Sequence, residues 1–102
     1  MDTLSTLYQT LLDRKNSEAQ TSYVASLYKK GTPGIVNKVI EEAVETGVEA
    51  MGDHLDKLAS ESADLLFHLM VLWAHKGITP QDVFSVLESR AGISGHTEKK
   101  SR

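Results

Sequence analysis

The sequence predicts an all-α protein of about five helices, in which two long antiparallel helices form the core of a helical-bundle dimer. Three observations support this fold class. Apolar residues recur at spacings of three and four, helix stop and start residues punctuate the chain, and no stretch shows the alternating pattern of a strand. The chain has 102 residues, enough for one domain, which we expect to cover residues 1–90.

The first expected helix is amphipathic and ends near Lys15-Asn16. Its apolar residues follow the i, i+3, i+4, i+7, i+8 spacing: Leu4, Leu7, Tyr8, Leu11 and Leu12. A polar stretch leads to a short second helix at residues 21–28. Lys29-Lys30-Gly31 should end it, because cations and a glycine favour a helix C-terminus.

Two long helices are expected in the centre of the chain. One runs from about Pro33, with Thr32 placed to cap it, to Met51 and stops at Gly52. Asp53 is placed to cap the other, which continues to Lys76-Gly77. Because the turn between them is short, we expect these helices to be antiparallel neighbours.

The last expected helix opens with Thr79-Pro80-Gln81-Asp82, a cap followed by a proline in the first turn, and ends near Arg90. The tail at residues 91–102 is small, polar and charged. We predict that this tail is disordered.

The second long helix is apolar on all sides rather than along one stripe. Its apolar residues are Leu65, Leu66, Phe67, Leu69, Met70, Val71, Leu72 and Trp73. Such a helix must be covered all round, and the other helices of one chain can hardly do that while leaving a wet acidic cleft. We therefore predict a homodimer with this helix, or both long helices, at the subunit interface.

Composition excludes several classes of protein. The formal net charge of −3 argues against a general nucleic-acid binder. The absence of cysteine excludes disulfides, thiolate nucleophiles and cysteine-bound zinc. Because the N-terminus lacks the features of a signal peptide and no apolar run could span a bilayer, we expect a cytoplasmic protein with no membrane partner.

Two carboxylate clusters, Glu41-Glu42-x-x-Glu45 and Glu61-x-x-Asp64, fall on the two long helices. The first three acids occupy an arc of about 100° on a helix, and Glu61 and Asp64 are neighbours one turn apart. Antiparallel packing would bring the clusters together, where a cation would offset their repulsion. Convergent carboxylates without thiols suit a hard cation such as Mg²⁺ or Mn²⁺. The alternative is a solvated glutamate-rich helix face.

The sequence lacks the histidine pattern of a diiron site. Diiron helical bundles use Glu-x-x-His, which occurs nowhere in this chain. His68 follows Asp64 by four residues, so its spacing fits either a contact with the acidic site or a hydrogen-bonded core histidine. His54, His75 and His96 are expected at the surface or in turns.

Three segments of the chain resemble the phosphoribosyl-ATP pyrophosphatases of histidine biosynthesis. They are Ser22-Tyr23-Val24-Ala25-Ser26-Leu27, Lys38-Val39-Ile40-Glu41-Glu42-Ala43-Val44-Glu45 and Glu61-Ser62-Ala63-Asp64-Leu65-Leu66-Phe67-His68-Leu69, with Lys30-Gly31 after the first. The likeness covers roughly residues 4–90. EExxE followed by ExxD is shared by the wider all-α nucleoside-triphosphate pyrophosphohydrolase superfamily, and the flanking residues narrow the likeness to the histidine-pathway enzyme.

The resemblance implies a hydrolase that converts phosphoribosyl-ATP to phosphoribosyl-AMP and pyrophosphate, the second step of histidine biosynthesis, with Mg²⁺ and as a dimer. It implies that the metal ligands are Glu42, Glu45, Glu61 and Asp64. Glu41 would be a further ligand or a base that orients the attacking water. Carboxylate-held metal would bridge the triphosphate, so that water attacks the phosphorus that ends as the monophosphate.

The resemblance also implies substrate contacts. Lys38 would contact the phosphates or the transition state, although its spacing also allows an ion pair with Glu42. His68 would contact the substrate or lie behind the metal ligands. Near the ribose and phosphates would lie Ser22, Tyr23 and Lys30, with Arg90 as a phosphate anchor. The alternatives for these four are a helix cap and solvated surface residues.

Thr46-Gly47 departs from the family, in which bulkier apolar residues tend to follow the last glutamate. A mid-helix glycine costs about 1 kcal/mol relative to alanine, and here it would permit a close helix approach or a kink.

Two other functions are consistent with these residues. One is a housecleaning pyrophosphohydrolase of free or damaged nucleoside triphosphates, which a comparison of substrates would reveal. The other is a non-catalytic helical dimer or adaptor, whose thermal stability would not respond to Mg²⁺ or Mn²⁺.

Overall fold

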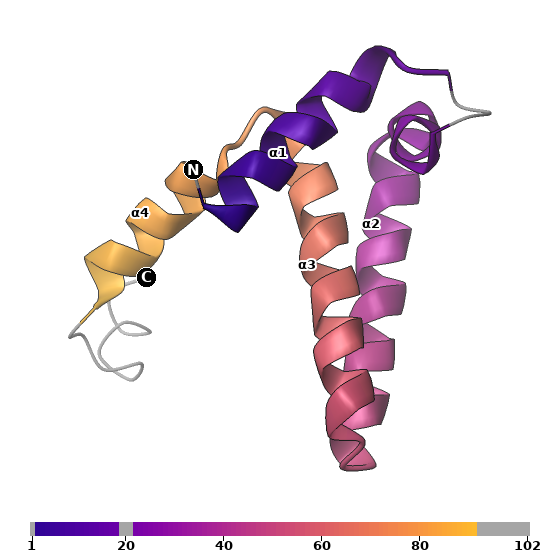
Figure 1. Cartoon of the computed structure of the whole chain (residues 1–102), viewed down its shortest axis with the longest axis vertical. Coiled ribbons are helices and arrows are strands. Elements are labelled where there is room, and N and C mark those ends of the chain that lie inside the picture. The colour runs from indigo at the N-terminus through magenta and orange to yellow at the C-terminus, as the bar shows by residue number, and fades with distance from the viewer. Residues whose placement is uncertain (1, 19–21, 92–102) are drawn as a thin grey trace.

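The computed structural model describes residues 2–18 and 22–91 and shows the predicted all-α fold. Its elements are α1 (Thr3–Asp13), the short 3₁₀ helix η1 (Arg14–Asn16), α2 (Tyr23–Met51), α3 (Leu55–Lys76) and α4 (Pro80–Arg90). α2 and α3 form an antiparallel hairpin, and α1 lies at the end of it remote from the turn (Figure 1). The predicted disordered tail beyond Ala91 lies outside the described residues, as does His96.

A kink at Gly31 divides α2 into two segments. Gly31 has φ 74° and ψ −174°, a backbone conformation that is essentially restricted to glycine. In Figure 1 the segment before the kink is seen nearly end-on, whereas the segment after it runs beside α3. The predicted break at this glycine is confirmed, but the described chain has four α-helices rather than about five.

Side-chain caps explain where the outer helices begin. The Asp2 carboxylate accepts a hydrogen bond from the Ser5 backbone N–H at 2.8 Å and starts α1. At α4, Thr79 and Asp82 form a reciprocal capping box with distances of 2.9 and 3.1 Å. The predicted start of the last helix is therefore confirmed.

The prediction that Asp53 caps the second long helix is wrong. The N-cap of α3 is His54, whose side chain makes no capping hydrogen bond. Asp53 instead takes a left-handed conformation with φ 56°, which aspartate tolerates better than most residues. The turn therefore uses Asp53 for its backbone conformation, and α3 begins one residue later than a cap at that position would place it.

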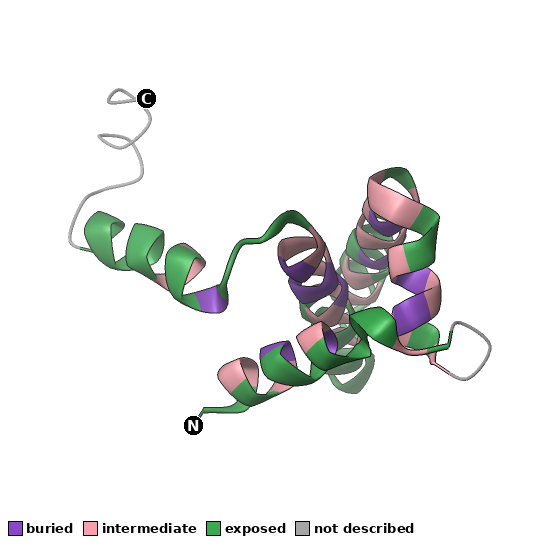
Figure 2. Cartoon of the chain, turned by 90° about the horizontal axis from the view of Figure 1, so that it is seen from above, coloured by how far each residue is buried: buried purple, intermediate pink, exposed green. Residues whose placement is uncertain are grey.

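The buried core lies where α1, α2 and the C-terminal part of α3 meet (Figure 2). Its fully buried large side chains are Leu11, Leu27, Ile35, Met70 and Val71. Tyr28 donates a hydrogen bond from its hydroxyl to the Leu11 carbonyl at 2.8 Å, and burial raises the pKa of this tyrosine to about 12. The core therefore holds one end of the hairpin.

The other end of the hairpin exposes apolar side chains. α3 is covered by its own chain more completely than predicted, since Leu66 is the one member of its apolar set that counts as exposed. On α2, the large apolar side chains left 56–90% exposed are Ile40, Val44, Val48 and Met51, which we call the α2 stripe. No helix in the described ranges is long and apolar enough to cross a membrane.

Candidate metal and substrate site

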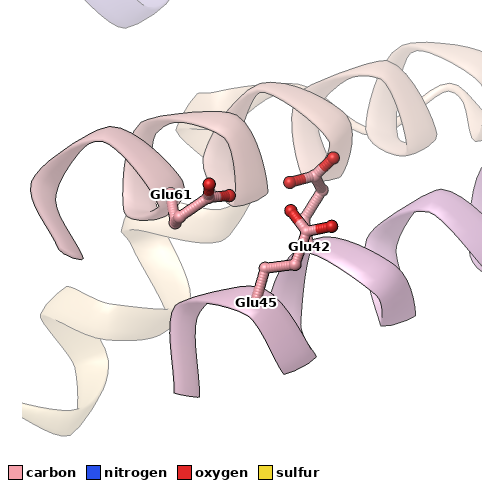
Figure 3. Close-up of side chains that lie close together, drawn as sticks. All are labelled: Glu42, Glu45 and Glu61. Atoms are coloured by element: carbon pink, nitrogen blue, oxygen red, sulfur yellow. The ribbon is translucent and has the colours of Figure 1, made fainter. Parts of the chain in front are cut away.

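Three carboxylates meet across the α2–α3 hairpin. Glu42 and Glu45 of α2 face Glu61 of α3, and one oxygen from each lies within 4.8 Å of the others. Figure 3 shows the three side chains directed into the space between the two helices. The i, i+3 spacing places the first two acids on one helix face, and the antiparallel hairpin brings the third opposite them. We call this group the carboxylate trio.

Burial leaves two oxygens of the trio without a partner. Glu42 Oε2 and Glu61 Oε2 are buried and accept no hydrogen bond within the described chain. An unsatisfied buried polar group costs about 1–3 kcal/mol, and more when it is charged. These two oxygens come from facing helices, so a cation between the helices would satisfy both.

The trio also changes the proton affinity of Glu61. Desolvation, a hydrogen bond with Glu45 and the negative charges of Glu45, Asp64 and Glu42 raise the pKa of Glu61 to about 7. Without added positive charge, the group therefore retains a proton up to about neutral pH.

Glu41 and Asp64 lie at the edge of the site, and both are exposed. The compact group of three does not include Asp64, although the charge of Asp64 contributes to the raised pKa of Glu61. The Glu41 carboxylate accepts a hydrogen bond from Lys38 Nζ at 3.3 Å. The structure thus places these two acids beside the trio rather than within it.

Lys38 is the cation nearest to these acids among the ion pairs of the described residues, with its Nζ 3.6 Å from Glu42 Oε1 as well. Burial lowers the pKa of Lys38, but the hydrogen bond to Glu41 and the charges of Tyr23, Glu41 and Glu42 raise it by more, so the net shift is upward. The ammonium group therefore stays charged beside the trio, and the ion pair expected from the spacing with Glu42 is present.

The remaining predicted site residues lie outside the trio, at the start of α2, further along α2 and on α4. Ser22 caps α2, because its Oγ accepts a hydrogen bond from the Ala25 N–H at 3.2 Å. Tyr23 Oη lies 2.8 Å from His68 Nε2. Lys30 is exposed just before the kink, and Arg90 ends α4, which extends away from the hairpin in both views (Figures 1 and 2).

His68 is buried, and its Nδ1 and Nε2 lie 2.7 Å from the Asp64 backbone carbonyl oxygen and 2.8 Å from Tyr23 Oη, which is the hydrogen-bonded histidine that its spacing allows. The prediction that His75 lies at the surface or in a turn is wrong. It is half-buried, its Nε2 is 3.1 Å from Thr32 Oγ1, and its ring packs against that of Tyr28. The spacing of seven residues from His68 could have revealed this, because it places both histidines on one side of the helix.

Thr46-Gly47 does not bend α2. Gly31 is the position in this helix with non-helical geometry, and a Cβ on Gly47 would meet nothing within 4 Å. Within the described chain, neither the expected kink nor a close helix approach occurs at this glycine. The Thr46 hydroxyl donates a hydrogen bond to the Glu42 carbonyl at 2.7 Å, a contact that sequence reasoning missed.

Comparisons with known proteins agree on one family. A family model described as phosphoribosyl-ATP pyrophosphohydrolase matches residues 4–91. The chain is 50% identical over 99 residues to a phosphoribosyl-ATP pyrophosphatase of Azospirillum brasilense, which covers 97% of this chain and 89% of that relative. A protein of the same name from Geobacter sulfurreducens is 46% identical over 101 residues, 99% of this chain and 94% of that relative. The chain therefore belongs to the phosphoribosyl-ATP pyrophosphohydrolase family.

Proposed function

We propose that this chain hydrolyses phosphoribosyl-ATP to phosphoribosyl-AMP and pyrophosphate, the second step of histidine biosynthesis. Family membership makes it a hydrolase of a phosphoric anhydride, and the relatives that are 46–50% identical carry this activity in their names. The observation within the chain that supports the proposal best is the carboxylate trio with two unpartnered buried oxygens.

The trio suits a divalent metal ion, which we propose to be Mg²⁺, with Mn²⁺ as a substitute. Its donors are all carboxylate oxygens, the ligand type that hard cations prefer. The buried Oε2 atoms of Glu42 and Glu61 fit a bound cation, because each is an acceptor without a hydrogen-bond partner in the described chain. When bound, such an ion supplies charge neutralisation for the phosphoanhydride and for the leaving pyrophosphate.

We assign the surrounding residues from their positions. Asp64 is the proposed fourth ligand, since it follows Glu61 by one turn and its charge already acts on that carboxyl. Lys38 offers a charged donor to the phosphate oxygens, held beside the trio by Glu41 and Glu42. Glu41, exposed and outside the trio, would orient the attacking water and accept its proton. We assign Glu45, within the trio, and Lys38, beside it, a role in catalysis as well as in binding.

Pyrophosphate release from phosphoribosyl-ATP, measured with and without Mg²⁺, tests this function. Glu45→Gln and Asp64→Asn should each lower kcat/KM at least about 100-fold, because each removes a charge from the ligand set. Glu49→Gln is the matched control, since Glu49 lies one turn further along α2 and outside the trio. Full activity in a folded Glu45→Gln or Asp64→Asn variant would remove that residue from the metal site.

Substrate comparison separates the two enzymatic functions that the residues allow. The wild-type protein should release pyrophosphate faster from phosphoribosyl-ATP than from dATP or dUTP. The reverse order would instead favour a housecleaning nucleoside-triphosphate pyrophosphohydrolase.

We also propose that the protein is a homodimer whose interface includes the α2 stripe. The four stripe residues follow one another at helical spacing and are all more than half exposed. A two-helix hairpin with one open apolar side requires further helices to cover it, and a second copy supplies two. Substrate contacts by Ser22, Tyr23, Lys30 and Arg90, and a cytoplasmic location, belong to the same proposal.

A further inference from the structure

His68 uses both of its ring nitrogens inside the protein. The side chain is only 5% exposed on α3. Its Nδ1 lies 2.7 Å from the Asp64 backbone carbonyl oxygen, and its Nε2 lies 2.8 Å from the Tyr23 hydroxyl. No nitrogen of this ring is therefore left to contact a substrate.

These two contacts determine where the protons lie. A carbonyl oxygen only accepts hydrogen bonds, so Nδ1 of His68 must carry a proton and donate it to Asp64. In the neutral ring Nε2 is then an acceptor, and the Tyr23 hydroxyl donates its single proton to it. The Tyr23 oxygen consequently has only lone pairs to offer on its other side.

Ring packing fixes the direction of the tyrosine. Tyr23 stacks on Phe67 with ring centroids 6.5 Å apart and meets the edge of the His68 ring at 5.9 Å. Phe67 and His68 also meet edge to face at 5.2 Å. Tyr23 is thus held at the start of α2, although it remains 53% exposed.

The Tyr23 hydroxyl lies near the acidic residues, because His68, to which it is hydrogen-bonded, contacts the Asp64 backbone one turn away on α3. Charges on Lys38, Glu42, Glu41 and Asp64 all act on the Tyr23 hydroxyl. Phosphate oxygens are acceptors, as is the tyrosine oxygen while its hydroxyl donates to His68, so the two do not attract each other. Hydrogen-bond donors match an acceptor here, and the hydroxyls of a sugar are such donors.

We propose that His68 is a positioning residue that fixes the Tyr23 hydroxyl as an acceptor for a sugar hydroxyl of the substrate. The proposal rests on the proposed function for the identity of the substrate. It assigns His68 an indirect role through Tyr23 and assigns Tyr23 a contact with ribose rather than with phosphate.

The tautomer of His68 provides a test that needs no substrate. ¹⁵N NMR of the imidazole, with the His68 signals assigned by their loss in His68→Gln, should show a protonated Nδ1 and an unprotonated Nε2 in the neutral ring. A protonated Nε2 would overturn the proposal whether or not the protein hydrolyses phosphoribosyl-ATP. Absence of wild-type turnover would instead refute the proposed function and leave this readout in place.

A double-mutant cycle tests the indirect role. Tyr23→Phe and His68→Leu should each raise the KM for phosphoribosyl-ATP about fivefold to tenfold, the size of one hydrogen bond, with a smaller change in kcat. The double variant should be no worse than Tyr23→Phe alone. Multiplying effects would mean that His68 acts on the substrate independently of Tyr23, which contradicts the proposal.

His68→Gln distinguishes positioning from a purely structural effect, because the glutamine side-chain oxygen can still accept a hydrogen bond from the Tyr23 hydroxyl. The KM of His68→Gln should therefore be lower than that of His68→Leu and closer to the wild-type value. Deoxyribose analogues of phosphoribosyl-ATP complete the test. The wild type should discriminate against at least one analogue about fivefold, and Tyr23→Phe should not. Equal discrimination by both proteins would exclude the sugar contact.

Discussion

Glu61 faces the carboxylates of Glu45 and Glu42 and lies one turn from Asp64, and these surroundings couple its protonation to folding. Its pKa rises from an ordinary value of 4.5 to about 7. A carboxyl group with a raised pKa in the folded state stabilises the fold fully below its unfolded pKa, and this contribution is lost as the pH rises through the folded pKa. The metal-free protein should therefore lose stability between about pH 4.5 and about pH 7.

Thermal unfolding of the metal-free protein across this pH range, for wild type and Glu61→Gln, measures the effect. The midpoint of the wild type should fall as the pH rises, and that of the variant should fall less. Mg²⁺ should raise the wild-type midpoint more above pH 7 than below it, because the ion competes with the proton. Identical pH profiles for the two proteins would show that Glu61 does not carry the coupling.

Individual site residues were predictable to different extents. Helical periodicity and a short turn suffice to bring Glu42 and Glu45 opposite Glu61, because both are local features of the sequence. The contact between Tyr23 and His68 spans 45 residues, and it joins α3 to the segment of α2 that precedes the kink at Gly31. Periodicity assigns a residue to a helix face but does not identify its partner on another helix.

The kink in α2 requires glycine at two positions. Besides the positive φ of Gly31, a Cβ on Gly34 would lie 2.5 Å from the Lys30 Cβ. Gly34→Ala should lower the free energy of unfolding by about 1–3 kcal/mol, the usual cost of overpacking. Urea unfolding measures this loss.

Lys30→Gly provides the matched test of the cause, because it removes the atom that a Cβ at Gly34 would meet. The double variant should lose less unfolding free energy than the sum of the losses in the two single variants, because the clash is gone. Strict additivity would mean that Gly34 is needed for another reason.

The break in α2 and the turn before α3 show how far helix stop and start residues predict the observed structure. Lys29-Lys30-Gly31 correctly predicts an interruption, because glycine alone tolerates the required backbone. The same signals do not tell a kink from a separate loop, which depends on whether the segments can keep packing against α3. Asp53 has a side chain suited to a cap, but it adopts the left-handed conformation of the turn, and the N-cap of α3 is the next residue, His54.

At the scale of the whole molecule, the α2 stripe leads to a prediction about assembly. Val48→Asp places a charge in this stripe and should raise the dimer dissociation constant at least about 100-fold, because it buries an unpaired charge. Ala43→Asp is the control, since Ala43 is also exposed on α2 but lies off the stripe. Sedimentation velocity of both variants measures the result, and a monomeric wild type at micromolar concentration would refute the proposed dimer.

The position of the core at one end of the hairpin determines which backbone opens first. Core contacts join Ile35 to Met70 and Val71, whereas the residues around the turn at 47–57 are almost all exposed. Segments with few buried apolar contacts open locally at a lower free energy than the whole domain unfolds. In an isolated chain, the half of the hairpin that carries Glu61 would therefore exchange its amide hydrogens while the core stays closed, and the proposed metal ion, on binding there, would slow that exchange.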